Sequence, residues 1–156
     1  MQGVIEGKNT MKLTDYITED TVFFSTTGHK KEIIAFVIDK AVSLGLVKDA
    51  EAFKFAIEER EAKLSTGIGE GIAIPHARIA GLDEYFILTV ILKNSIGWDA
   101  LDQKPVSMVF LIGGPEDDAS TYLKILAKLM GVVKNDEKRA AILNAADQAE
   151  VVSFFG

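Results

Sequence analysis

Two nearly continuous apolar segments, residues 85–92 (YFILTVIL) and 105–112 (PVSMVFLI), constrain the fold more than any other feature of the sequence. Their lengths fit β-strands, and near-continuous apolar character is typical of strands that are buried on both faces. Segments with helical spacing lie before and after them. The sequence therefore predicts an α/β fold, a single-domain sandwich in which a central mixed β-sheet is flanked by helices.

Capping residues indicate where the helices begin and end. Apolar residues at helical spacing follow Gly28 and stop near Gly45, a second helix is predicted to begin at Asp49, and another at Asp117 or Asp118. The side chains predicted to face the core from the last two of these helices are Ala52, Phe53, Ala56, Ile57, Leu123, Leu126, Leu129, Met130 and Val133.

Composition excludes several classes of protein. The 156 residues include 17 Lys and Arg against 23 Asp and Glu, a net charge of −6, which argues against a general nucleic-acid-binding surface. The absence of Cys excludes disulfides, thiolate metal sites and a cysteine nucleophile. No apolar run approaches the roughly 20 residues of a membrane-spanning helix, and residues 1–10 do not resemble a secretory signal. We therefore expect a cytoplasmic protein with no nucleic acid partner and no direct membrane insertion.

The length fits one domain, and no linker, repeat or block of like charge divides the chain. Met11 opens a second start-like pattern, MKLTDYI. We expect residues 1–10 to be an N-terminal extension outside the fold and residues 11–156 to form the domain.

The segment with the most chemical content is residues 65–78, STGIGEGIAIPHAR. Its glycines allow positive φ angles and a close approach of the backbone to a ligand or partner. Pro75 fixes its own φ and favours an extended Ile74, which leaves little backbone freedom at His76. In an extended segment His76 and Arg78 would share a face, roughly 6–7 Å apart along the chain.

That pair of side chains suits phosphoryl transfer. A neutral imidazole has a free lone pair on one nitrogen, and it can attack phosphorus to form a phosphoramidate. The reaction then needs positioning and stabilisation of charge on the equatorial oxygens. Arg78 offers a forked cationic donor, and the glycine-rich backbone offers neutral N–H donors.

Other interpretations of these residues remain open on spacing alone. A His after a Pro is commonly a turn residue, and an Arg nearby is commonly a solvated surface charge. The alternating glycines of residues 67–71 match neither GxGxxG nor a P-loop, so no nucleotide cofactor is predicted. His29 and His76 are the only histidines and lack metal-ligand spacing, so no metal is predicted.

Residues 60–61 (Arg-Glu), 65–78 and 81–83 (Gly-Leu-Asp) closely resemble the phosphohistidine signature of enzyme IIA domains of the fructose/mannitol class. These domains belong to the bacterial phosphoenolpyruvate-dependent phosphotransferase system. The resemblance covers essentially residues 11–156. Other residues that carry it are Lys31-Glu32, Trp98, Leu101-Asp102 and Lys104-Pro105-Val106.

The resemblance implies that His76 accepts a phosphoryl group on Nε2 from the phosphocarrier protein HPr and commonly passes it to a cysteine of a IIB domain, and so to sugar. It implies a shallow site at the edge of a mixed sheet, with no metal or nucleotide. Thr66 and Arg78 match positions thought to line the phosphate site.

Two departures from the family pattern bear on turnover. Tyr122-Leu123 stands where the family usually has a His-Leu pair, and Gln103 stands where it usually has Gly. A neutral Tyr122 can donate a hydrogen bond to a phosphoryl oxygen but cannot act as a base near pH 7, and it is equally interpreted as a packing aromatic.

Three functions follow as hypotheses. The first is a phosphohistidine carrier of the sugar phosphotransferase system, with phosphate-binding by Arg78, Thr66 and Tyr122. The second is a nitrogen-type regulatory IIA protein that binds target proteins according to its phosphorylation state. The third is a degenerate member that never carries phosphate, against which His76 and Arg78 argue.

Overall fold

A computed structural model describes residues 11–26 and 28–156. Residues 1–10, for which an extension outside the fold is predicted, lie outside the described residues. The strands are β1 (Val22–Ser25), β2 (Gly67–Gly69), β3 (Ile72–Ala73), β4 (His76–Ile79), β5 (Phe86–Ile96) and β6 (Val106–Pro115). The helices are the 3-10 turns η1 (Leu13–Asp15) and η2 (Glu19–Thr21), and the α-helices α2 (Lys30–Ser43), α3 (Ala50–Lys63), α4 (Ala119–Val133), α5 (Asp136–Leu143) and α6 (Gln148–Ser153).

The strands form one six-stranded mixed sheet in the order β1-β5-β6-β3-β2, with β4 also paired to β6. β5 and β6 are antiparallel, whereas β3 and β4 both run parallel to β6. Because Ile72 pairs with Met108 and His76 pairs with Ile112, β3 and β4 lie one after the other along β6. The predicted α/β fold with a central mixed sheet is confirmed.

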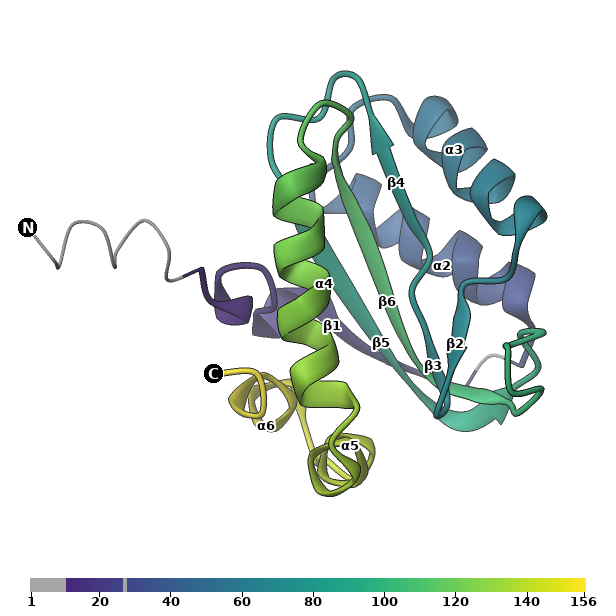
Figure 1. Cartoon of the computed structure of the whole chain (residues 1–156), viewed down its shortest axis with the longest axis vertical. Helices are drawn as coiled ribbons and strands as arrows, with labels where there is room; N and C mark the ends of the chain where they lie inside the picture. The colour runs from purple at the N-terminus through teal and green to yellow at the C-terminus, as the bar shows by residue number, and fades with distance from the viewer. Residues whose placement is uncertain (1–10, 27) are drawn as a thin grey trace, which may run out of the picture.

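Helices cover both faces of the sheet: α2 and α3 lie on one face, and α4, α5 and α6 lie on the other (Figure 1). Alternate residues of β5 serve the two layers, since Leu88 and Val90 pack toward α2 and α3 while Ile87 and Ile91 pack toward α4. All four side chains are buried. This double cover explains why the two central strands are apolar without alternation.

The predicted helix starts are confirmed by their caps. The carboxylate of Asp49 accepts a hydrogen bond from the N–H of Ala52 at 3.0 Å and begins α3. At α4 the cap is Asp118, whose side chain accepts from the N–H of Thr121 at 3.1 Å. In each case the side-chain oxygen satisfies a donor that the first helical turn leaves free.

Two predictions of the core were wrong. Leu123 is 60% exposed and Ala52 is also exposed, although both were predicted to face inward. The buried stripe of α4 runs through Ile125, Leu129 and Val133. Leu123 precedes that stripe by two positions, about 200° around the helix at 3.6 residues per turn, so it points to the opposite side.

Candidate functional site

His76 begins β4 directly after a segment that is held from both sides. The N–H of Ile74 donates to the carbonyl of Thr66 at 3.0 Å, and the carbonyl of Pro75 accepts from the N–H of Ile112 at 3.0 Å. Pro75 itself has no N–H and a fixed φ. The backbone that leads to His76 is therefore extended and constrained, as the sequence predicts.

The glycines of this segment allow the chain to reverse before His76. Gly69 and Gly71 have φ angles of 99° and 77°, in the left-handed region that residues with a Cβ avoid. The turn between them lets β2 pair antiparallel with β3. Its glycines thus have a structural role in shaping the hairpin that precedes the histidine.

The imidazole of His76 has a defined tautomer. Its Nδ1 lies 2.9 Å from the carbonyl oxygen of Ile74. Because a carbonyl oxygen only accepts, Nδ1 carries the hydrogen, and the neutral ring keeps its lone pair on Nε2. Burial lowers the pKa of His76, and the positive charges of Arg60 and Arg78 lower it further, against the opposing effects of the Ile74 hydrogen bond and Glu61. The ring is thus uncharged at neutral pH, with Nε2 available as a nucleophile.

A surface hollow of about 400 Å³ lies beside the imidazole. It is formed between the C-terminal half of α3 and the start of β4. Its lining residues are Ala56, Glu59, Arg60, Lys63, His76, Ala77, Arg78 and Glu116. Three cations outnumber the two carboxylates of Glu59 and Glu116 around this histidine, an arrangement suited to an anion of the size of a phosphoryl group.

Arg78 is held toward this hollow by a backbone contact. Its Nη1 donates to the carbonyl oxygen of Glu116 at 3.1 Å. Arg78 is two residues after His76 on β4, and both line the hollow, so the shared face predicted from an extended segment is present. The remaining guanidinium N–H groups can serve a bound anion.

Arg60 and Lys63 line the same hollow but were not singled out as site residues from the sequence. They lie on the last turn of α3, far from His76 along the chain, and only the packing of α3 against β4 brings them to the imidazole. The available signal was the Arg60-Glu61 pair within the residues that resemble the family signature.

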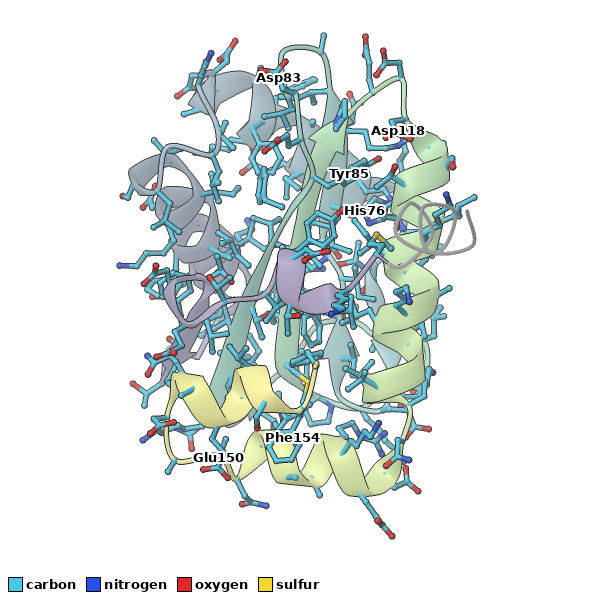
Figure 2. The ribbon with its side chains drawn as sticks, turned by 90° about the vertical axis from the view of Figure 1, so that its left-hand side faces the viewer. His76, Asp83, Tyr85, Asp118, Glu150 and Phe154 are labelled. Carbon is cyan, nitrogen blue, oxygen red and sulfur yellow. The ribbon has the colours of Figure 1, made fainter. Side chains whose placement is uncertain are left out.

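Tyr122 lies on the other side of the imidazole, on the first turns of α4. The centroids of the two rings are 5.1 Å apart and their planes are inclined by 32°. Figure 2 shows His76 on the side of the sheet where α4 runs, with Asp118 at the N-terminal end of that helix. Burial raises the pKa of the Tyr122 phenol, so the hydroxyl stays protonated and can donate a hydrogen bond at neutral pH.

Thr66 lies away from the hollow, and its side chain is already engaged. It is 3% exposed, its Oγ1 donates to Oε1 of Glu61 at 2.5 Å, and the indole N–H of Trp98 donates to that same Oγ1 at 3.2 Å. The structure thus brings His76, Arg78 and Tyr122 together, whereas the side chain of Thr66 is buried and does not line the hollow. A phosphate contact by Thr66 stays a prediction, and it would need another arrangement of this hydroxyl.

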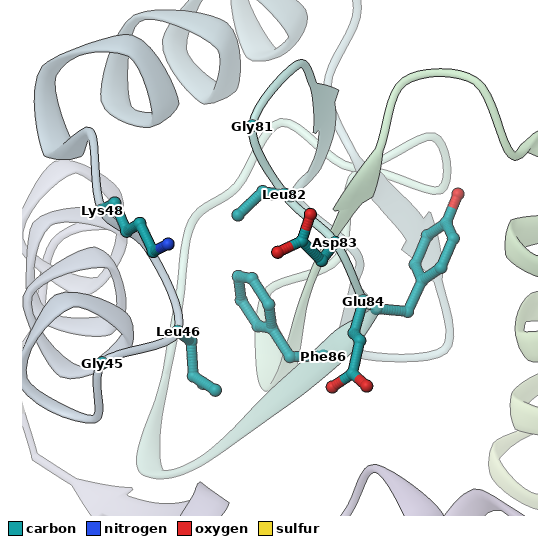
Figure 3. Close-up of a pocket in the computed structure, with 9 residues that line it drawn as sticks. Gly45, Leu46, Lys48, Gly81, Leu82, Asp83, Glu84 and Phe86 are labelled. Atoms are coloured by element: carbon teal, nitrogen blue, oxygen red, sulfur yellow. The ribbon is translucent and has the colours of Figure 1, made fainter.

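A different hollow, of about 310 Å³, opens between the α2–α3 and β4–β5 connections (Figure 3). Lys48 lies on one side, and Asp83 and Glu84 lie on the other. Two carboxylates against one ammonium group make it a poor site for a phosphoryl group. The hollow beside His76, which contains the imidazole and three cations, is the candidate active site.

Within residues 11–26 and 28–156, no three His, Asp or Glu side chains gather as a metal site would require. Over that same part of the chain, no helix has the length and apolar character needed to cross a membrane.

The family model described as "Phosphoenolpyruvate-dependent sugar phosphotransferase system, EIIA 2" matches residues 15–156. EIIA domains are phosphotransferases that work through a phosphohistidine. This chain belongs to that family of EIIA domains.

Relatives in the family include both sugar-specific and regulatory proteins. The chain is 34% identical over 146 residues to a fructose-specific EIIABC component from Bacillus subtilis, a match that covers 91% of the chain and 22% of that relative. It is 31% identical over 147 residues to a nitrogen regulatory protein homolog from Haemophilus influenzae, covering 88% of both proteins. The chain thus spans about a fifth of the length of the Bacillus protein and most of the length of the Haemophilus protein.

Solved structures share the fold. The nitrogen regulatory protein IIA-Ntr from Neisseria meningitidis superposes with a TM-score of 0.86 at 25% identity, covering 92% of this chain and 99% of that one. Enzyme IIA-Mtl from Escherichia coli, solved in complex with phosphorylated enzyme IIB-Mtl, gives a TM-score of 0.75 at 16% identity, covering 87% and 94% of the two chains. The second likeness shows the fold alone.

Proposed function

We propose that this chain is a phosphohistidine carrier of the phosphotransferase system and that Nε2 of His76 is the atom that receives the phosphoryl group. The observation that supports this most directly is the 2.9 Å contact between Nδ1 and the Ile74 carbonyl, which leaves Nε2 with the lone pair. Its position beside a cationic hollow adds the charge that the transferred group requires.

The first transfer takes the group from an HPr-like phosphocarrier. The Nε2 lone pair of His76 attacks phosphorus as the bond from phosphorus to the donor's nitrogen breaks, and the donor keeps that electron pair. Arg60 and Arg78 offset the charge on the equatorial oxygens. The Ile74 carbonyl meanwhile holds the Nδ1 hydrogen and stabilises the positive charge that develops on the ring.

The second transfer delivers the group to a cysteine thiolate of a IIB domain. The thiolate attacks phosphorus, the bond to Nε2 breaks, and Nε2 regains its lone pair, so the carrier returns unchanged. The complex of IIA-Mtl with phosphorylated IIB-Mtl, a protein of this fold, supports a IIB domain as the acceptor. Both partners meet the same exposed hollow in turn.

Intact mass after incubation with phosphoenolpyruvate, enzyme I and HPr tests this proposal. The wild-type chain should gain the mass of one phosphoryl group, and His76→Ala should gain none. His29→Ala is the matched control, because His29 is the other histidine and its side chain is 83% exposed. Labelling of folded His76→Ala would overturn the assignment of the acceptor.

A second candidate function is supported by the likeness to nitrogen regulatory proteins, which reaches a TM-score of 0.86 over 99% of the Neisseria chain. Phosphorylation of His76 would add roughly −1.5 to −2 charge to a hollow lined by Arg60, Lys63 and Arg78. A target protein that recognises the cationic surface would then be released, and one that needs a neutral surface would bind.

Pull-downs with the phosphorylated and unphosphorylated chain separate the two candidates. Rapid transfer onto a IIB cysteine favours the sugar carrier. Capture of a target protein by only one of the two forms, without transfer to IIB, favours regulation.

A further inference from the structure

Glu61, on the last turn of α3, joins three separate parts of the chain. Its Oε2 lies 2.8 Å from Nζ of Lys30 at the start of α2 and accepts from the N–H of Thr66 at 2.8 Å. Its Oε1 accepts from the hydroxyl of Thr66 at 2.5 Å. The side chain is only 9% exposed, and these contacts offset the cost of burying a carboxylate.

From Thr66, two more hydrogen bonds lead to the histidine. The Thr66 carbonyl accepts from the N–H of Ile74 at 3.0 Å, and the Ile74 carbonyl accepts from Nδ1 of His76 at 2.9 Å. Thr66 and Ile74 are thus each bonded through both their N–H and their C=O groups. The series Glu61, Thr66, Ile74 and His76 fixes the position of each member relative to the next.

We propose that Glu61 is a positioning residue for His76, an inference that rests on the proposed function of His76 as the phosphoryl acceptor. By holding Thr66, Glu61 fixes the Ile74 carbonyl and so keeps the hydrogen on Nδ1 and the lone pair on Nε2. Glu61 is not among the residues that line the hollow, so it acts on the reaction through other residues.

The contacts of Glu61 with Thr66 also fix the position of the neighbouring cation, Arg60. Arg60 immediately precedes Glu61 on α3, and its guanidinium lines the hollow. Anchoring Glu61 to the segment before His76 therefore anchors the last turn of α3, and with it Arg60, at a fixed distance from the imidazole. Misplacement of reacting groups by about 1 Å can cost roughly 10²-fold in rate, so such an anchor affects turnover.

In this network Thr66 has a role other than a phosphate contact. Its hydroxyl donates to Glu61 and accepts from the indole of Trp98, whose carbonyl also accepts from Nζ of Lys30 at 3.4 Å. Thr66 thereby links Glu61 to the segment that carries His76. This explains the side-chain burial of a residue that the family resemblance assigns to the phosphate site.

The variant Glu61→Gln tests the proposal. A glutamine replaces one of the two acceptor oxygens by a donor NH₂ group and carries no charge for Lys30, so it cannot offer Thr66 an acceptor at both of the positions that the carboxylate oxygens occupy. Long-range ¹⁵N NMR of the unphosphorylated protein should show a larger share of the Nε2–H tautomer of His76. The initial rate of phosphorylation by phosphorylated HPr should fall about 10- to 100-fold.

Glu58→Gln is the matched control, because Glu58 is an exposed residue of the same helix and the charge change is the same. It should keep the wild-type tautomer and rate. Thr66→Val, which removes the hydroxyl and retains only the N–H contact to Glu61, should show a smaller shift in the same direction as Glu61→Gln.

A folded Glu61→Gln protein with the wild-type tautomer and rate would overturn the proposal. If Glu61→Gln does not fold, Thr66→Val decides: an unchanged His76 spectrum in that variant would also overturn it. The tautomer is read without any phosphoryl donor, so the network is tested separately from the proposed function. A tautomer shift in Glu61→Gln, with no labelling of the wild-type His76, would support the network and reject the carrier role.

Discussion

The imidazole of His76 packs against the phenol ring of Tyr122, with the ring centroids 5.1 Å apart. Rings at this separation and inclination attract each other, so Tyr122 helps to hold the imidazole. Because burial raises the pKa of Tyr122 above its ordinary value of 10.0, the phenol remains neutral wherever the imidazole titrates. The imidazole of His76 therefore changes its charge with pH, whereas the phenol of Tyr122 remains a neutral hydrogen-bond donor.

Tyr122→Phe separates packing from hydrogen bonding. The change keeps the ring and removes only the hydroxyl, so the fold should persist. If the hydroxyl donates to a phosphoryl oxygen, phosphorylation of His76 should slow roughly 10- to 100-fold, the equivalent of one hydrogen bond to a charged group of about 1.5–3 kcal/mol. Initial rates followed by intact mass provide the measurement, and an unchanged rate would leave Tyr122 with packing alone.

Tyr122→His restores the residue that the family usually has at this position. A second imidazole can carry charge near neutral pH, which a phenol cannot. We expect transfer of the phosphoryl group from this variant to a IIB cysteine to become about tenfold faster than from the wild type. This is the gain expected when a charged hydrogen-bond donor replaces a neutral one. Single-turnover transfer measures this, with Tyr122→Phe as the comparison, and an equal rate in all three proteins would reject the idea that Tyr122 limits turnover.

The sequence was sufficient for the central features of the fold and for the placement of His76 and Arg78 beside one another. The apolar runs form β5 and β6, and they could be recognised because a strand that is buried on both faces consists almost entirely of apolar residues. The spacing of His76 and Arg78 could be interpreted because alternate residues of a strand share a face. Arg60 could not be derived in the same way, since it reaches the hollow through the packing of α3 against β4.

Two side chains, those of Leu123 and Thr66, lie where the sequence pattern alone does not place them, and the physical reasons are similar. Leu123 is apolar yet 60% exposed, because the sequence gives the spacing of α4 but not its rotation about its axis. Thr66 belongs to the right motif, but a motif does not show whether a hydroxyl points to solvent or to a buried carboxylate such as Glu61. Side-chain direction depends on neighbours that are distant in the sequence.

Arg60→Ala should weaken phosphoryl acceptance without preventing folding. Loss of one charge-assisted hydrogen bond to a phosphoryl oxygen corresponds to about 1.5–3 kcal/mol, or roughly 10- to 100-fold in rate. Because the Arg60 charge lowers the pKa of His76, that pKa should also rise toward its ordinary value. Lys54→Ala removes an exposed cation of the same helix and is the control for lost charge. It should match the wild type both in the initial rate of phosphorylation and in the pKa of His76.

Gln103→Gly should stabilise the protein. Gln103 has a φ angle of 61°, in the left-handed region, at the position where the family usually has Gly. A residue with a Cβ costs roughly 1–2 kcal/mol there, and the greater freedom of glycine in the unfolded chain offsets about 0.4–1 kcal/mol of that, so a net gain of up to about 1.6 kcal/mol is expected. Urea unfolding measures the gain, and Gln103→Ala, which keeps the Cβ, should show none.

The pH dependence of stability should report the environment of His76. Burial, followed by the charges of Arg60 and Arg78, lowers the pKa of His76 below its ordinary 6.5. The unfolded chain therefore binds a proton at this residue more readily than the folded protein does. The contribution of His76 to the free energy of unfolding is complete above pH 6.5 and is lost as the pH falls from that value toward the lowered pKa of the folded state.

His76→Gln provides the reference for this measurement, because it removes the titrating ring and leaves every other titratable group in place. Urea unfolding from about pH 8 to about pH 5 should show the wild type losing stability relative to His76→Gln only at the acidic end. The rate of phosphoryl acceptance by the wild type should depend on pH in the same direction as its stability. The rate should stay level from neutral pH down to below 6.5, because Nε2 keeps its lone pair there. It should fall only once the folded imidazole takes up a proton. A rate that already declines at neutral pH would mean that the imidazole is more basic than its burial and its cationic neighbours allow.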